Sequence, residues 1–196
     1  MQQQLHELIK KNQRYQMNPN QSRIHISLDL ETLSTESTAA IVQIGAKQLY
    51  SDNTFSQYIS PQSAERAGGT VSTETLEWWD KQDPTVRAVV MGGTRTHYEV
   101  LDDFDIWVHE LCAGDYDRVY LWSNGADFDL PILRNAYELY RSYPFNFRNH
   151  RCYRTLLAEF NMPRTKSKVA HNALSDAVAQ AKDIEKILDL LAHNHQ

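Results

Sequence analysis

The sequence lacks several features that would assign it to other classes of protein. It has two cysteines, Cys112 and Cys152, and no Cys-x-x-Cys pair, which argues against a disulfide framework and a cysteine-based zinc site. No apolar run approaches the ~18 residues needed to cross a bilayer, and the first residues lack the apolar core of a secretory signal. We therefore expect a reduced, cytoplasmic protein that does not contact membranes.

Basic charge is also scarce. The 196 residues include 20 Lys and Arg against 25 Asp and Glu, a formal net charge of −5, which disfavours a broad phosphate-binding face. The deficit is uneven, because seven basic residues and one acidic residue, Glu159, lie between Arg141 and Lys168. Residues 99–117 carry only acidic charges. We expect the basic segment to contact phosphates and the acidic segment to face away from them.

The length and the 41% hydrophobic content suit a single domain with a substantial core. Residues 1–22 are rich in Gln and Asn and form an expected N-terminal extension, which leaves one domain over residues 23–196.

Apolar and polar residues alternate strictly over 24–30, which predicts a strand. Further strands are expected at about 40–50 and 53–60, joined to the first as an antiparallel meander. Helices are expected from Thr73, from Pro84 and over 99–112, then a strand over 118–122 and helices over 128–140, 151–160 and 173–192. This order predicts an α/β fold with a sheet of mixed direction.

Four acidic residues stand out by their positions. Asp29 and Glu31 lie two residues apart at the end of the first strand, and so share one face of the sheet. Asp129 follows a strand and a glycine turn, and Asp176 begins the last helix, five residues after His171. Each of these residues alone could also have a purely structural role, as a solvent-exposed acid at the end of a strand or as an acid at a helix N-terminus. Together they match the oxygen ligands that two-metal phosphoryl hydrolysis needs, and hard carboxylates favour Mg²⁺ or Mn²⁺.

Three motifs occur in order: Asp29-Leu30-Glu31 as D-x-E, Asn124 to Asp129 as N-x-x-x-F-D, and His171 to Asp176 as H-x-x-x-x-D. This set resembles the DEDDh family of 3′–5′ exonucleases, which have a ribonuclease H-like fold of three antiparallel strands followed by parallel strands, flanked by helices. Residues 75–79 and 121–125 further resemble a subgroup of phage and prophage exonucleases and a mycobacterial exoribonuclease.

The resemblance implies that Asp29, Glu31, Asp129 and Asp176 hold two Mg²⁺ or Mn²⁺ ions and that His171 is the general base. Asp127 sits at a position where the motif allows any residue, so Asp127 in place of Asp129 is the alternative ligand. The expected substrate contacts are Thr32 and Leu33 at the terminal nucleotide, with Asn124, Trp78, Arg151 and Arg154.

The implied activity is the metal-dependent hydrolysis of single-stranded DNA or RNA from the 3′ end to nucleoside 5′-monophosphates. Two other functions stay open: a nucleic-acid-binding protein of the same fold that does not cleave, and a hydrolase of short oligonucleotides. The choice between DNA and RNA also stays open, as does the choice between a monomer and a homodimer.

Overall fold

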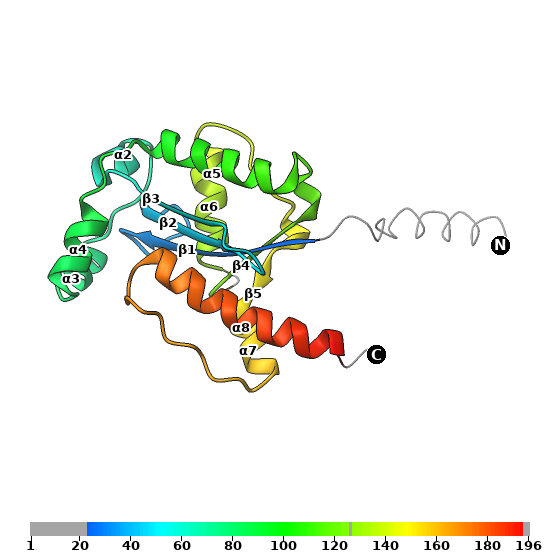
Figure 1. The fold of residues 1–196 in the computed structure, drawn as a ribbon. Helices are drawn as coiled ribbons and strands as arrows, with labels where there is room; N and C mark the ends of the chain where they lie inside the picture. Colours follow the sequence, from blue (N-terminus) through cyan, green and yellow to red (C-terminus); the bar gives the residue numbers. More distant parts are fainter. Residues whose placement is uncertain (1–22, 126, 194–196) are drawn as a thin grey trace, which may run out of the picture.

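Residues 23–125 and 127–193 are described by a computed structural model (Figure 1), so the expected extension over residues 1–22 lies outside the described residues. The elements in chain order are β1 (Ile24–Thr32), β2 (Ile41–Gln48), β3 (Thr54–Tyr58), α2 (Pro61–Arg66), α3 (Thr73–Trp79), α4 (Pro84–Met91), α5 (His97–Cys112), η1 (Tyr116–Arg118), β4 (Val119–Ser123), α6 (Asp129–Glu138), η2 (Phe147–Asn149), β5 (Arg151–Cys152), α7 (Tyr153–Glu159) and α8 (Ala173–His193).

The strands form one mixed sheet in the order β3-β2-β1-β4-β5. The first three strands pair as the expected antiparallel meander, while β4 runs parallel to β1 and β5 runs parallel to β4. The sequence reading of 151–160 as one helix was wrong at its start. Arg151 and Cys152 pair with Trp122 and Ser123 as β5, and α7 begins only at Tyr153.

Helices cover both faces of the sheet, as Figure 1 shows. Ile26, Leu28 and Leu30 of β1 belong to the main core, together with apolar residues of α5 and α6. On the other face, Trp122 of β4 belongs to a second cluster with Tyr153 of α7 and Ile184 of α8. The odd-numbered residues of β1, which include Asp29 and Glu31, therefore lie on the face that α8 covers.

The close approach of α8 to the sheet depends on Gly45. This glycine lies in β2 directly opposite Asp29 of β1. A Cβ atom built at Gly45 would lie 2.2 Å from the backbone carbonyl carbon of Ala173 and 2.2 Å from the backbone nitrogen of Leu174. The first turn of α8 therefore packs against bare backbone, and a side chain at this position would push the helix away.

The helix boundaries follow local capping chemistry. Thr96 and Glu99 form a capping box, so α5 begins at His97, two residues before the expected start. Ser60 caps α2 with Pro61 at its first position, a short helix that the sequence reading did not assign. The acidic segment around α5 lies on the face of the sheet opposite α8 (Figure 1).

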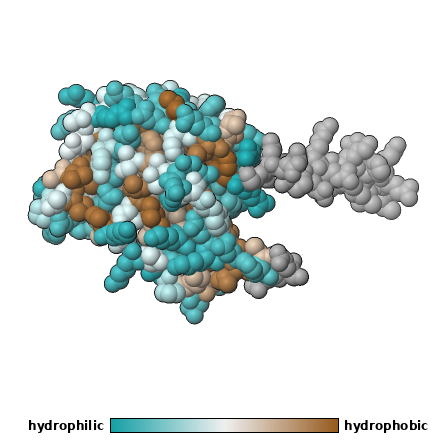
Figure 2. All heavy atoms as spheres, in the orientation of Figure 1, coloured by the Kyte–Doolittle hydropathy of each residue, from teal (hydrophilic) through white to brown (hydrophobic). Residues whose placement is uncertain are grey.

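Hydrophobic surface is divided into separate patches among hydrophilic residues, and one patch lies over α3 and α4 (Figure 2). Leu76 and Trp78 of α3 and Val89 of α4 are exposed there. Within residues 23–125 and 127–193, every helix is too short or too polar to span a membrane.

The substitution Gly45→Ala should lower the free energy of unfolding by about 3 kcal/mol, because the new methyl group would overlap the backbone of α8. Urea unfolding followed by circular dichroism measures this effect. The control Lys47→Ala, on the same face of β2, should change stability by less than about 0.5 kcal/mol. Equal midpoints for Gly45→Ala and the wild type would contradict the proposed contact.

Candidate active site

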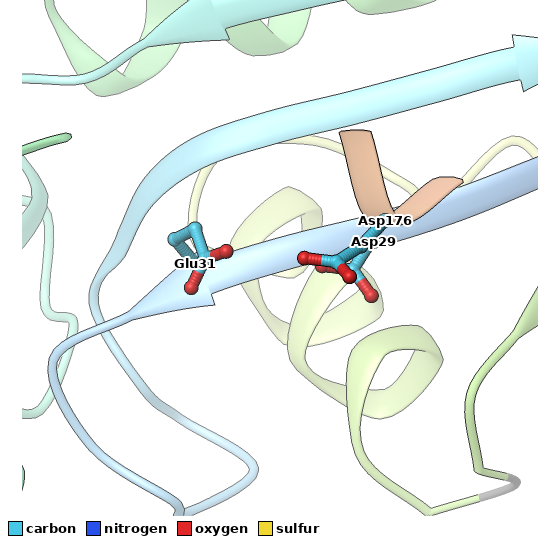
Figure 3. Close-up of side chains that lie close together, drawn as sticks. All are labelled: Asp29, Glu31 and Asp176. Atoms are coloured by element: carbon cyan, nitrogen blue, oxygen red, sulfur yellow. The ribbon is translucent and has the colours of Figure 1, made fainter. Parts of the chain in front are cut away.

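Two carboxylates extend from the end of β1 toward α8. Asp29 and Glu31 have oxygen atoms that lie within 4.8 Å of one another and of a carboxylate oxygen of Asp176. Figure 3 shows the three side chains converging, two from β1 and one from the first turns of α8. The alternation of β1 places Asp29 and Glu31 on one face, and the docking of α8 on Gly45 brings Asp176 to them.

The start of α8 is fixed by hydrogen bonds to the sheet. The backbone nitrogen of Ala173 donates to Oε1 of buried Gln43 at 3.1 Å, and the amide of Asn172 donates to the hydroxyl of Tyr58 at 3.1 Å. Asn172 Oδ1 also accepts from the backbone nitrogen of Ser175 at 3.1 Å, which caps the helix. These bonds hold the turn that carries Asp176.

Asp129 meets the same site from α6. Its side chain is 3% exposed, and its Oδ1 accepts from the backbone nitrogen of Leu30 at 3.1 Å, between the two acids of β1. Asp127 is exposed to solvent. The structure therefore buries Asp129 beside the cluster and leaves Asp127 exposed.

The acids disturb one another's protonation. Burial raises the pKa of Asp29 well above its usual range, and the charges of Asp129, Glu31 and Asp176 add to this. Burial, with the charges of Asp176 and Asp129, raises the pKa of Glu31 to about 8. Burial raises the pKa of Asp129 to about 6, although three backbone N–H groups and Arg154 oppose the rise. Without a cation, the cluster favours bound protons.

Gln180 is a member of the site that the sequence reading missed. Its Nε2 donates to Asp29 Oδ1 at 2.8 Å, and the residue is buried on α8. Its Oε1 has no hydrogen-bond partner among the residues that the structure describes. Gln180 lies four residues after Asp176, so the helical period places both on one face, and this spacing was the available signal.

His171 precedes α8 and packs against two tryptophans. Its ring lies 4.7 Å from that of Trp78 in an edge-on contact and 6.4 Å from that of Trp79. Trp79 is buried and donates from Nε1 to the carbonyl oxygen of Thr32 at 3.0 Å, whereas Trp78 is 40% exposed. The backbone of His171 has a φ of 58°, in the left-handed region, so the chain turns sharply here before α8 begins.

A cleft of about 660 Å³ connects these groups. The acids Asp29, Glu31 and Asp176 line it with His171, and residues 164–167 of the segment before α8 line it as well. Asn124 also lines the cleft, and its backbone carbonyl oxygen accepts from Arg154 Nη2 at 2.9 Å. The structure therefore brings two of the expected substrate contacts, Asn124 and Arg154, to the site. A third, Trp78, lies beside it, because its ring contacts the ring of His171.

The structure does not bring the other three expected substrate contacts into the cleft. Leu33 is 3% exposed and packs in the main core, and the hydroxyl of Thr32 donates to the carbonyl oxygen of Ser34 at 2.8 Å. Arg151 lies over the ring of Tyr120 and donates to the carbonyl oxygens of Arg148 and His150. The internal partners of all three side chains account for these positions.

The fold is similar to that of several solved exonuclease structures. The nuclease domain of 3′hExo, a DEDDh family member bound to rAMP, matches with a TM-score of 0.58 and 15% identity, over 87% of this chain and 94% of that one. Exonuclease I from Methylocaldum szegediense matches with a TM-score of 0.59 and 14% identity, over 86% and 41%. The zinc-bound E. coli exonuclease I–single-stranded DNA complex matches with a TM-score of 0.56 and 12% identity, over 88% and 43%. The chain thus spans less than half the length of the two exonuclease I proteins.

The fold of this chain is therefore similar to that of a DEDDh family nuclease domain. Residues 24–188 match the family model described as the Rv2179c-like 3′–5′ exoribonuclease domain, and the chain belongs to this family. A search of curated proteins returned no match.

The family implies a divalent cation, and the described residues fit one. The cluster supplies hard oxygen ligands from two elements, β1 and α8, held close together at the cost of mutual repulsion. The unpartnered Oε1 of Gln180, in the lining of the same cleft, adds a buried polar atom beside them.

In EDTA, the protein should lose stability as pH rises from about 4.5 to about 8. Over this range the unfolded chain releases the proton of Glu31 while the folded protein retains it, so the raised pKa makes folding less favourable at higher pH. We expect a loss of roughly 3–5 kcal/mol in the free energy of unfolding. Urea titrations at pH 5 and pH 8 measure it.

The variant Glu31→Gln removes this titration, so its loss between pH 5 and pH 8 should be smaller than that of the wild type. Glu65→Gln, an exposed substitution on α2, is the matched control and should follow the wild type. A decline in Glu31→Gln as steep as in the wild type would contradict this electrostatic account.

Proposed function

We propose that the protein is a metal-dependent exonuclease that removes nucleotides from the 3′ end of single-stranded nucleic acid and releases nucleoside 5′-monophosphates. The observation that carries this proposal is the convergence of Asp29, Glu31 and Asp176 in one cleft with His171, with Asp129 hydrogen-bonded to the strand between the two acids of β1. The family description names exoribonuclease activity, which makes RNA the first substrate to test.

Asp29, Glu31, Asp129 and Asp176 would hold two Mg²⁺ or Mn²⁺ ions. Such ions lower the pKa of the attacking water and neutralise charge on the leaving oxygen. The chain's contribution is to keep the carboxylates in place. Leu30 donates a hydrogen bond to Asp129, and Gln180 donates one to Asp29. In each of these two carboxylates one oxygen is held in place, and the other oxygen is available to bind a cation.

His171 is the proposed general base. In the reaction, water attacks the terminal phosphorus, the bond from phosphorus to the 3′ oxygen of the preceding nucleotide breaks, and that oxygen gains a proton. His171 accepts the proton that the water loses. The edge contact with Trp78 orients the imidazole, and exposed Trp78 offers a ring for stacking on the terminal base.

Single-stranded RNA and DNA oligonucleotides, labelled at the 5′ end in one set and at the 3′ end in another, test polarity and sugar preference together. With Mg²⁺ or Mn²⁺, the 5′-labelled strands should shorten stepwise, and the 3′-labelled strands should release a labelled mononucleotide at once. Asp29→Ala and Asp129→Asn should lower the rate by more than about 10²-fold, because bound metal ions supply several kcal/mol.

Asp127→Asn is the control, because Asp127 is exposed two residues before Asp129, and it should retain the wild-type rate. Activity in Asp29→Ala equal to the wild type would overturn the proposal. Tight binding of the strands by the wild type without any product would favour the non-cleaving alternative.

His171→Ala should lower kcat by about 10²–10⁴-fold and leave Mn²⁺ binding intact, because the histidine moves a proton and holds no cation. Initial rates and calorimetric titration with Mn²⁺ measure the two effects. His109→Ala, on α5 on the opposite face of the sheet, should match the wild type. An unchanged kcat in His171→Ala would remove this residue from its assigned role.

A further inference from the structure

A buried carboxylate on α8 has no part in the proposed mechanism. Asp183 lies seven residues after Asp176 and is 0% exposed. It faces the return segment, residues 160–172, which leaves α7 and runs beside α8 back to its first turn (Figure 1). A buried charge is costly unless several donors meet it, so Asp183 needs partners.

The return segment supplies two of the four hydrogen bonds described for Asp183. Asp183 accepts from the backbone nitrogen of Thr165 at 2.8 Å and from its hydroxyl at 2.6 Å. It also accepts from the hydroxyl of Tyr153 at 2.8 Å and from Lys186 Nζ at 3.3 Å. Burial opposes the charged form, but these hydrogen bonds outweigh it and lower the pKa of Asp183. One ionised side chain thus fastens the middle of the return segment to α8.

Thr165, which Asp183 holds, lies between two basic residues in the sequence. Arg164 and Lys166 flank Thr165, and all three residues line the same cleft as the acids. The guanidinium of Arg164 lies 5.7 Å from the ring centre of Tyr153, the same residue that donates to Asp183. With its amide oxygen turned toward the cleft, Asn124 accepts from Arg164 Nη2 at 3.0 Å.

We propose that Asp183 is a positioning residue that holds Thr165, and through it Arg164 and Lys166, where these cations bind a phosphodiester of the strand whose 3′ end lies at the carboxylates. The proposal rests on the proposed function. It assigns the phosphate contact to Arg164 and Lys166, whereas the sequence reading selected Arg151 and Arg154.

The energetic argument is one of pre-organisation. The acids of the cleft repel a phosphate, so a strand needs positive charge in the same cleft, and an arginine fork matches phosphate oxygens well. Ordering a free loop during binding costs about 1–2 kcal/mol per residue. Two hydrogen bonds from Thr165 to Asp183 order the loop before substrate binds, so the free energy of binding does not include this loss of loop entropy.

Steady-state kinetics on two substrates test the proposal: a 12-nucleotide single strand, and the p-nitrophenyl ester of thymidine 5′-monophosphate, which has no neighbouring phosphodiester. Asp183→Asn, Thr165→Val and Arg164→Gln should each raise KM for the strand by about 5–20-fold. The kcat on the ester should stay within about twofold. These outcomes separate strand binding from chemistry.

Salt dependence gives the readout that a merely structural role would not change. For the strand, the plot of log(kcat/KM) against log[KCl] should become shallower by about 0.7 in Arg164→Gln, the value for one lost phosphate contact on single strands. Asp183→Asn and Thr165→Val should become shallower too, and Thr165→Ser should restore the wild-type slope. In a variant that already carries Arg164→Gln and Lys166→Gln, the further substitution Asp183→Asn should change the salt dependence of kcat/KM for the strand very little.

Arg148→Gln removes the same charge from an exposed arginine stacked on Phe147, and it should retain the wild-type slope and KM. The proposal is overturned if Asp183→Asn and Thr165→Val lower kcat equally on both substrates and keep the wild-type slope, which would leave Asp183 a structural anchor only. A wild type without activity on either substrate would overturn the proposed function, and the present proposal with it.

Discussion

The contact between the backbone of α8 and the bare backbone of Gly45 is the constraint on which the site depends. Gly45 pairs with Asp29 across the sheet, so the backbone of α8 packs closely against β2 directly beside this acid. A helix held even one methyl group farther out would carry Asp176 and Gln180 away from β1. The sheet and the last helix therefore determine the geometry of the carboxylates jointly.

The same contact forces like charges together, and the fold contains compensating features. Asp29, Glu31 and Asp176 repel one another in a partly buried setting, which raises the affinity of the cluster for any cation or proton. Neutral donors hold individual oxygens without cancelling the charge, namely the N–H of Leu30 and the amide of Gln180. The basic groups Arg164 and Lys166 line the same cleft as the cluster.

Local pattern was enough to predict much of this arrangement. The alternation of 24–31 fixed the face of Asp29 and Glu31, and the Phe128-Asp129 pair pointed to Asp129, which the structure buries at Leu30. Parts of the fold depend on tertiary contacts and could not be predicted in this way. Arg151 and Cys152 form a strand only because β4 lies beside them, and their own sequence does not signal it.

The charge of the basic residues likewise could not show which of them line the cleft. Arg141 lies between Asp102 and Asp105 of α5 and Arg151 lies on Tyr120, whereas Arg164 lines the cleft. All three belong to one basic stretch of the sequence, and the packing partners that distinguish them come from elements far away along the chain. Asp183 is a similar case, because an acid on a long helix is ordinarily a solvent-facing residue.

The hydrogen bonds that build the site join residues very far apart in the chain. Asp29 and Gln180 are separated by 151 positions, and Leu30 and Asp129 by 99. Such long-range closures slow folding, and local structure that forms early does not include them. A chain that has formed only its meander and its middle helices therefore has two acids on an open strand and no assembled cleft. The assembled cleft is therefore a property of the finished fold and not of any one segment.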